Sequence, residues 1–391
     1  MRTHARVVVI GGGVVGVSTL YHLVKKGLSD SVLIERRELT SGSTWHAAGL
    51  LPLFNLSYSV GQIHKYSVAL YKRLAAETGL NVGLAQVSNI RLARTQDRLE
   101  EYKYYAGVAA TIGVDVKFLT PRQVKEVWPL CEVDDLIGAI QHPEDGYIQP
   151  ADLTQALARG ARNGGGEINR NTVVTAIEKT ASGEWKVVTD KGDISAPIVI
   201  AATGPWSRPL FEYVGYALPI EAELHQVAIL KNAPTMKGGG CACIDSVTET
   251  YFRSDAYDKF LVGDFWGERP VNPDNFPQRA ADASLEEMIE RTCGRIPKLE
   301  NAEVMRGVTG VYDMTPDSRP LLGQIPEIAG LYVCAGFSGM GFKISPAIGL
   351  VMSELLLDGR GKTVDIHAFR PNRFAENQPI QSEYEYVDDT Y

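Results

Sequence analysis

The stretch that decides the fold is Arg6-Val7-Val8-Val9-Ile10-Gly11-Gly12-Gly13-Val14-Val15-Gly16. A short β-branched apolar run meets a G-x-G-x-x-G pattern, and residues 17–24 then have the composition of a helix. A second apolar strand, 31–34, ends on Glu35, at the distance from the glycines where an acidic residue binds a ribose. Arg36 and Arg37 could suggest a 2′-phosphate on the ligand. The negative charge of Glu35 would repel such a phosphate, and this repulsion outweighs the attraction of the two arginines. This order of elements predicts a bound dinucleotide.

Each glycine of the pattern has a physical reason. Gly11 allows the tight turn, Gly13 lets the backbone approach a pyrophosphate, and Gly16 lets the helix pack closely on the strand. The N-terminus of the helix offers unpaired N–H groups and partial positive charge to the phosphates. The pattern alone does not separate FAD from NAD.

Composition excludes several classes of protein. At 391 residues the chain suits two domains, and its 45% hydrophobic and 22% charged residues are typical of a globular protein. A net charge of −8 argues against nucleic acid as a partner. No apolar run reaches the roughly 18–20 residues of a membrane span, and we see no targeting segment. We therefore expect a cytoplasmic protein.

The five cysteines show no disulfide framework, because their number is odd and their spacing irregular. Only Cys241 and Cys243 are close in sequence, and no further metal ligands follow them. We expect reduced thiols and no metal site.

Two later glycine-rich turns predict that the cofactor domain is discontinuous. Residues 201–207 follow an apolar strand over 194–200, and residues 336–343 follow a buried strand over 331–335 and open a helix over 344–357. Between them, residues 219–266 have the pattern of several β-strands. This interleaving is more typical of a flavin enzyme than of an NAD dehydrogenase.

The predicted fold class is α/β (α+β overall), with a Rossmann-type FAD-binding domain interleaved with a mainly antiparallel β-sheet substrate domain. The expected FAD-binding segments are 1–80, 145–215 and 305–370, and the expected substrate-domain segments are 81–144 and 216–304. Residues 371–391 form an acidic C-terminal tail, expected on the surface or on a partner. Local expectations are one strand over 167–179 and a helix over 285–293 capped by Ser284.

Residues 42–50, Gly-Ser-Thr-Trp-His-Ala-Ala-Gly-Leu, carry a resemblance to a known family. From about Val7 to Phe374 the chain resembles the amine-oxidising flavoproteins of the D-amino-acid-oxidase superfamily, most of all the dimethylglycine and sarcosine dehydrogenases. The histidine of this motif carries FAD covalently in that family, through the 8α-methyl group, so the resemblance implies this role for His46. Monomeric sarcosine oxidases use a cysteine at a position that here looks like Gly310, which excludes that attachment.

Three further stretches resemble the same superfamily. Residues 336–343 are similar to a G-F-S-G-H-G-F-K loop that lies against the flavin pyrimidine, where a helix N-terminus stabilises negative charge. The resemblance implies that Lys343 binds a substrate carboxylate. Residues 219–226 and 251–253 resemble strands of the active site, which implies catalytic and substrate-binding roles for His225 and Tyr251. The implied cofactor-binding residues are Gly11, Gly13, Val14, Val15, Gly16, Glu35, Arg36, Ser43, Thr44, His46, Ala47, Ala48, Gly49, Leu50, Val174, Gly204, Trp206, Gly339, Met340, Gly341 and Lys343.

The implied reaction is oxidation of a carbon next to an amine nitrogen in a small N-methylated amine or amino acid, such as dimethylglycine, sarcosine or N-methylproline. A hydride passes to flavin N5, and the iminium hydrolyses to formaldehyde and the demethylated amine. His225 would keep the amine neutral or accept its proton, Tyr251 would hydrogen-bond the substrate, and Lys343 would hold a carboxylate. The chain ends at Tyr391, so the resemblance implies that the folate-binding domain of the long relatives is lacking.

Alternatives remain open for the electron acceptor and the assembly. Leu261 stands where sarcosine oxidases place an oxygen-activating lysine, with Lys259 two residues earlier, which favours an electron-transfer flavoprotein over O2. The chain could also be an O2-using oxidase of the same substrate class, the flavin-bearing subunit of a heteromeric amine oxidase or dehydrogenase, or a flavin-binding regulator without turnover.

Overall fold

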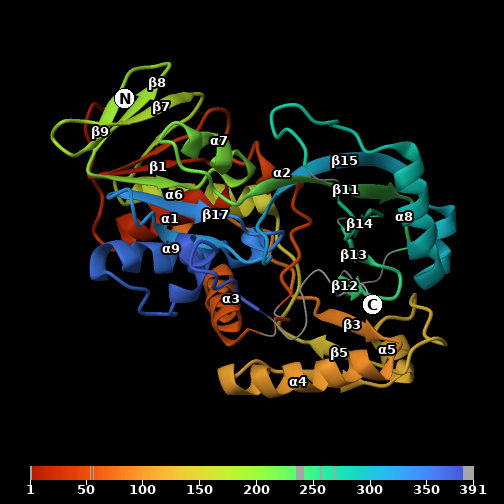
Figure 1. The fold of residues 1–391 in the computed structure, drawn as a ribbon. Coiled ribbons are helices and arrows are strands. Elements are labelled where there is room, and N and C mark those ends of the chain that lie inside the picture. The colour runs from red at the N-terminus through yellow and green to blue at the C-terminus, as the bar shows by residue number, and fades with distance from the viewer. Residues whose placement is uncertain are drawn as a thin grey trace.

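The N-terminal glycine loop lies at the centre of the first large sheet (Figure 1). The computed structural model describes residues 2–52, 54–55, 57–234, 242–255, 258–267 and 270–381. All neighbouring pairs of this sheet are parallel except the last at one edge, and the parallel strands follow the Rossmann order. In spatial order the strands are β16 (Leu321–Gln324), β17 (Leu331–Ala335), β10 (Ile198–Ala201), β1 (Val7–Ile10), β2 (Ser31–Ile34) and β6 (Glu167–Asn169).

Both faces of this sheet are covered, which is why its central strands are continuous apolar runs. Val7 and Val9 pack among helices, while Val8 and Ile10 pack against a small sheet and α7, because successive side chains point to opposite faces. In Figure 1 the helices lie below β1 and the small sheet above it. The covering elements are α1 (Val14–Lys25), α3 (Tyr58–Thr78), α6 (Pro150–Asn163), α9 (Gly341–Asp358), α7 (Ser207–Glu212), β7 (Val174–Lys179), β8 (Trp185–Thr189) and β9 (Ile194–Ala196).

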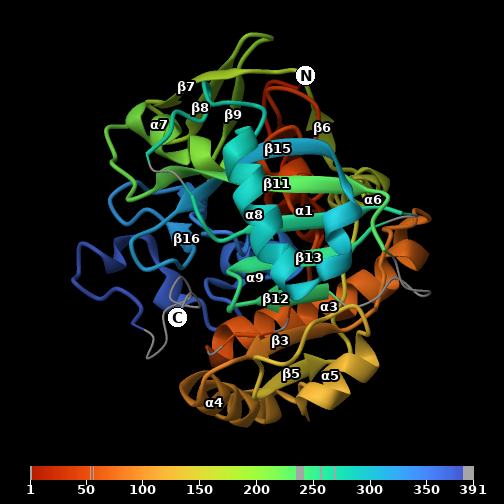
Figure 2. The same cartoon turned by 90° about the vertical axis from the view of Figure 1, so that its right-hand side faces the viewer.

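A second, eight-stranded sheet is antiparallel apart from the β12–β3 pair. Ala228, Phe252 and Val262 face α8 (Asp282–Arg295), which crosses the sheet in Figure 2, whereas Val227 and Tyr251 face the other way. In spatial order its strands are β15 (Glu303–Met314), β11 (Glu221–Lys231), β14 (Phe260–Asp264), β13 (Thr250–Ser254), β12 (Ala242–Asp245), β3 (Asn89–Ala93), β5 (Gly138–His142) and β4 (Lys117–Leu119).

The remaining helical elements are short connections or outer helices. They are α2 (Ser43–His46), α4 (Gln96–Ile112), α5 (Pro121–Val127), η1 (Gly204–Trp206), η2 (Pro297–Asn301), η3 (His367–Phe369) and η4 (Pro371–Arg373). The expected Rossmann-type domain interleaved with a mainly antiparallel sheet is confirmed.

Three local expectations were wrong. The strand expected over 167–179 is broken, because Asn171 adopts φ +54° and the chain turns from β6 in one sheet to β7 in another. The strand expected over 194–200 is likewise divided at Pro197, which has no N–H to donate to a ladder. Ser284 does not cap α8, because the helix already begins at Asp282 after Ala281.

The domain boundaries stay predictions, but the structure around two of them differs from what the sequence led us to expect. The boundary expected at residue 305 falls inside β15, which pairs with β11 in the second sheet. Arg373, assigned to the tail, is buried, and its Nη2 lies 2.8 Å from Asp317 Oδ1. The rest of the tail from residue 382, and Cys241, lie outside the described residues.

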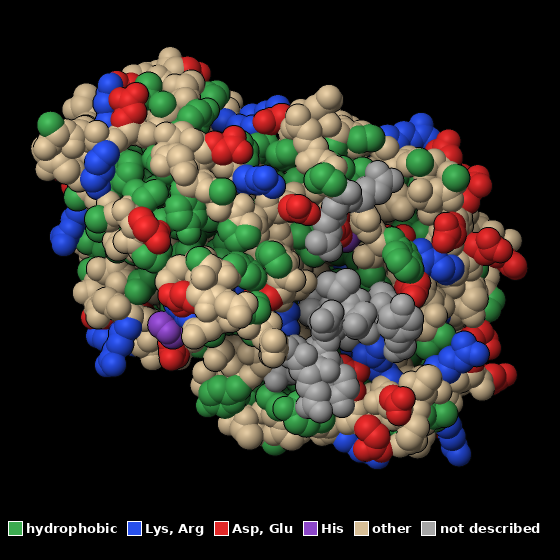
Figure 3. Space-filling model, in the orientation of Figure 1, with side chains coloured by type: hydrophobic (Ala, Val, Ile, Leu, Met, Phe, Trp, Pro, Cys, Tyr) green, Lys and Arg blue, Asp and Glu red, His purple; other side chains and the backbone are tan. Residues whose placement is uncertain are grey.

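The surface charges and the cysteines of the described residues do not indicate a further site. On the face drawn in Figure 3, basic and acidic side chains of the described residues are interspersed rather than gathered by sign. No helix in the described ranges is long and apolar enough to cross a membrane. Within those ranges no cluster of three or more His, Cys, Asp or Glu could hold a metal ion, and Cys131, Cys293 and Cys334 are free thiols.

The contact between α9 and α1 gives a first prediction. A Cβ added at Gly349 would lie 2.4 Å from the Ser18 carbonyl oxygen, so Gly349→Ala should lower the free energy of unfolding by about 1–3 kcal/mol. Gly107 in α4 has open space around it, so Gly107→Ala should instead raise that free energy by up to about 1 kcal/mol. Urea unfolding followed by circular dichroism measures both. Equal shifts of the two midpoints would contradict this account of the contact.

Candidate active site

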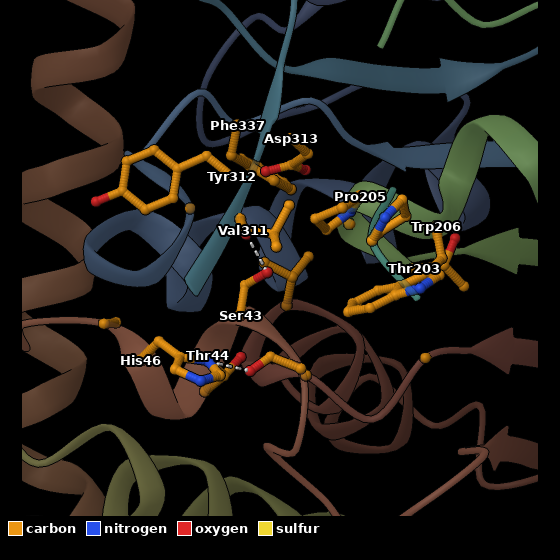
Figure 4. A pocket seen from close by; sticks show the side chains of 18 of the residues that line it. Ser43, Thr44, His46, Thr203, Pro205, Trp206, Val311, Tyr312, Asp313 and Phe337 are labelled. Carbon is orange, nitrogen blue, oxygen red and sulfur yellow. Dashed lines mark hydrogen bonds between the residues drawn. The ribbon is translucent and has the colours of Figure 1, made fainter. Parts of the chain in front are cut away.

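A cavity of about 770 Å³ is lined by residues of both large sheets (Figure 4). Its wall includes the carboxyl ends of β1, β2, β10 and β17, where ligands of open α/β sheets bind, and side chains of β11, β13, β14 and β15. The predicted residues that line it are Gly11, Gly13, Val14, Val15, Glu35, Arg36, Ser43, Thr44, His46, Ala47, Ala48, Gly49, Leu50, Val174, Gly204, Trp206, His225, Tyr251, Gly339, Gly341 and Lys343.

Two predicted cofactor residues do not line the cavity. A Cβ on Gly16 would lie 2.0 Å from the Gly11 carbonyl oxygen, so Gly16 serves the close approach of helix to strand. Met340 is fully buried in the hydrophobic core beside α9, with its Sδ 3.8 Å from Asn55 Nδ2. A contact between Met340 and the cofactor stays a prediction.

The end of the cavity at β1 and β2 fits a dinucleotide. Gly13 is the N-cap of α1 and has no side chain to cap the helix, although Val14 N donates to Thr44 Oγ1 at 3.0 Å. The first turn holds no acidic residue, so the positive end of the helix dipole faces the cavity. Gly11 adopts φ +114°, and an added Cβ would lie 2.3 Å from the Ala202 carbonyl oxygen. Glu35 Oε2 accepts a hydrogen bond from Gly12 N at 2.6 Å, which fixes the carboxylate beside the loop.

A second helix N-terminus faces the same cavity. Gly341 and Lys343, in the first turn of α9, line it, and that turn has neither an acidic residue nor a side-chain cap. Asp313 Oδ2 accepts a hydrogen bond from Gly336 N at 2.6 Å and so attaches the preceding loop to β15. Burial raises the pKa of Asp313 to about 6, against the effect of these backbone hydrogen bonds.

His46 lies on the short helix α2, against β15 (Figure 4). Its Nδ1 lies 3.0 Å from the Gly42 carbonyl oxygen, which can only accept, so Nδ1 carries the proton and Nε2 has the lone pair. Burial lowers the pKa of His46 and favours this neutral ring. A Cβ added at Gly310 would lie 2.6 Å from His46 Cβ, so the glycine leaves room for the histidine.

His225 and Tyr251 line the part of the cavity formed by the second sheet. His225 Nε2 lies 2.7 Å from Glu223 Oε1, and burial lowers the pKa of this histidine to about 4. The ring of Tyr251 lies over Gly263, where an added Cβ would be 2.2 Å from Tyr251 Cζ. Among the described lining residues, Lys343 is the only lysine or arginine besides Arg36 and Arg37.

Several lining residues were missed by sequence reasoning. Glu223 could have been found, since it stands two residues before His225 and so on the same face of a strand. Asp264, Asp274, Tyr312 and Asp313 had no such signal, because only the tertiary fold brings them to the cavity. Leu261, discussed above for oxygen activation, lies in the apolar cluster around Tyr251 and does not line the cavity.

Comparison with known proteins assigns the family. The model of the family described as FAD dependent oxidoreductase matches residues 6–355. The chain belongs to this family. FAD is therefore its cofactor class, and the glycine loop, Glu35 and the two helix N-termini fit that group.

The similar proteins include enzymes named for amines and amino acids. It is 31% identical to mitochondrial dimethylglycine dehydrogenase of Rattus norvegicus, over 96% of this chain and 45% of that one. It is 33% identical to mitochondrial sarcosine dehydrogenase of Homo sapiens, over 95% and 41%. It thus spans less than half the length of these two relatives. The structure of L-proline dehydrogenase from P. horikoshii superposes with a TM-score of 0.91 at 28% identity, covering 97% of this chain and 100% of that chain.

Three segments of the cavity wall meet in one polar contact. Asp274 Oδ1, in the segment between β14 and α8, accepts hydrogen bonds from Arg36 Nη1 at 2.7 Å and Trp206 Nε1 at 2.8 Å. The Arg36 guanidinium also stacks 4.2 Å from the Trp206 ring. This contact joins the predicted cofactor residues Arg36 and Trp206 to the second half of the molecule.

We expect Asp274→Ala to weaken FAD binding about 1.4- to 5-fold, because an exposed ion pair contributes roughly 0.2–1 kcal/mol. Titration of FAD fluorescence in a His46→Ala background measures this without interference from a covalent bond. Asp193→Ala is the control, since its ion pair with Lys186 is similarly exposed and lies outside the cavity wall. An equal effect of both substitutions would contradict the role of the contact.

Proposed function

We propose that the chain oxidises a small N-methylated amine or amino acid such as dimethylglycine, sarcosine or N-methylproline, with release of formaldehyde and the demethylated amine. The observation that carries the proposal is the convergence of His225, Tyr251 and Lys343 on the cavity that the glycine loop and His46 also line. The similarity to the dimethylglycine and sarcosine dehydrogenases supports this substrate class.

FAD, when bound, supplies the two-electron oxidation of the carbon next to nitrogen. The chain's own residues bind and orient the substrate. Lys343 would hold a carboxylate by a charge-assisted hydrogen bond, and the Tyr251 hydroxyl would hydrogen-bond the substrate. His225 is neutral above pH 5, because its pKa is about 4, and can accept the amine proton.

We propose a covalent bond between FAD and His46. The Nδ1–H to Gly42 hydrogen bond leaves Nε2 as the nucleophilic nitrogen, and burial keeps the ring neutral. Gly310, which lies directly against His46, provides the room.

Acid precipitation tests the covalent bond. Wild-type protein should give a yellow pellet, whereas His46→Ala should release all of its FAD into the supernatant. His22→Ala is a suitable control, because His22 lies outside the cavity wall. A colourless wild-type pellet would contradict the covalent bond but not FAD binding.

Anaerobic mixing with a panel of amines tests the reaction. Sarcosine, dimethylglycine, N-methylproline or L-proline should bleach the flavin absorbance, and the methylated substrates should yield formaldehyde. Absence of bleaching by every amine of the panel would contradict the proposed function.

Lys343→Met should raise the dissociation constant of carboxylate substrates about 10- to 100-fold, because a charge-assisted hydrogen bond contributes roughly 1.5–3 kcal/mol. Amines without a carboxylate should be little affected. Lys362→Met is the control, since Lys362 pairs with Asp358 outside the cavity wall. Equal weakening of both amine classes would exclude a carboxylate contact.

The proposal also includes the acceptor of the electrons from the flavin. We propose an electron-transfer flavoprotein as acceptor, with O2 as the alternative. The solved L-proline dehydrogenase, whose whole chain matches this one, supports considering a proline-like secondary amine as a substrate.

A further inference from the structure

Glu223 is an unusual residue to find inside a β-sheet, because glutamate is rarely buried unless it is paired. It lies on β11 two residues before His225, and the two side chains are only 6% and 8% exposed. Both line the cavity, on the sheet face opposite the one that packs on α8. Their contact, 2.7 Å between His225 Nε2 and Glu223 Oε1, has the length of a strong hydrogen bond.

Packing holds both partners of this pair. The His225 ring stacks on Tyr312 with 3.9 Å between centroids and 23° between planes. Tyr312 is directly opposite Glu223 in the β11–β15 ladder. Gly267 makes room for the carboxylate, since an added Cβ there would lie 2.2 Å from Glu223 Oε1.

The hydrogen bond decides which nitrogen of His225 can act as a base. A carboxylate only accepts, so Nε2 carries the proton, and Nδ1 is the remaining atom with a lone pair. Nδ1 is buried and has no hydrogen-bond partner among the described residues.

On the basis of the proposed function, we propose that Glu223 is a positioning residue that holds His225 as the Nε2–H tautomer and receives that proton during deprotonation of the substrate. The substrate N–H bond breaks as Nδ1–H forms, and the Nε2–H bond breaks as Oε1–H forms. One ammonium and one carboxylate thus become a neutral amine and a carboxylic acid, with no change in oxidation state.

The other titratable groups near the His225 ring make contacts with other residues. Asp264 on β14 accepts from Arg291 Nη2 at 3.1 Å through Oδ2, and Tyr251 lies over Gly263. His46 lines a small cavity together with His225, on the side of Gly310. Asp264 favours the charged form of His225, but burial outweighs it. Among the described residues, Glu223 is the carboxylate in hydrogen-bond contact with His225, which is why the proton transfer is assigned to it.

Nitrogen-15 NMR of histidine-labelled protein tests the tautomer without any substrate. The His225 signals, assigned with His225→Asn, should show Nε2 protonated and Nδ1 unprotonated at pH 7. Glu223→Gln should keep this tautomer, because an amide oxygen can still accept, whereas Glu223→Leu should lose the preference. A protonated Nδ1 in the wild type would overturn the proposal.

Stopped-flow reduction of the flavin tests the proton transfer. Glu223→Gln should lower the limiting rate about 100-fold at pH 7, with little change in substrate affinity. This deficit should shrink as the pH approaches the pKa of the substrate amine, because the amine then arrives neutral. Glu221→Gln is the matched control, since Glu221 lies on the same strand but is exposed.

A wild-type rate in Glu223→Gln, or a deficit that does not depend on pH, would overturn the transfer. Failure of every amine to reduce the wild-type flavin would instead contradict the proposed function, while the NMR measurement would still judge the tautomer.

Discussion

The close approach of α1 to β1 is the constraint on which the cavity depends. The two elements approach until a Cβ at Gly16 would be 2.0 Å from the Gly11 carbonyl oxygen. This contact aims the N-terminus of α1 at the carboxyl end of the sheet, where β1 and β10 diverge in the strand order. Gly349 permits a second close approach of the same kind, because its missing side chain lets α9 pack on Ser18 of α1. Two helix N-termini therefore reach one cavity.

Successive side chains of a β-strand point to opposite faces, so the two faces of the second sheet have different roles. Ala228, Phe252 and Val262 form a core with α8, while the side chains between them lie on the opposite sheet face, the one that borders the cavity. One face therefore supplies stability and the other is available for chemistry. Glycines on the cavity face, at 263 and 310, give the rings of Tyr251 and His46 their space.

Local motifs made the first half of the site predictable from sequence. Gly11 and Glu35 belong to a strand–turn–helix–strand unit whose geometry is fixed by short-range contacts. His46 follows 11 residues after Glu35 and was found through the family resemblance of residues 42–50. Asp274 could not be predicted, because its role exists only where the segment before α8 meets Arg36 and Trp206. The break between β6 and β7 was missed because both strands have acceptable patterns, and only pairing assigns them to different sheets.

Charge distribution divides the cavity into two unlike halves. Near β1 and β2, the N-terminus of α1 and the Arg36 side chain favour an anionic group such as a pyrophosphate. The other half carries Glu223 and Asp264, and burial raises the pKa of Asp264 against the opposing effect of Arg291. Carboxylates in a poorly hydrated wall attract a cationic amine, whereas the neutral His225 between them does not repel it. Under the proposed function, the wall that attracts the ammonium form would therefore also hold the groups that remove its proton.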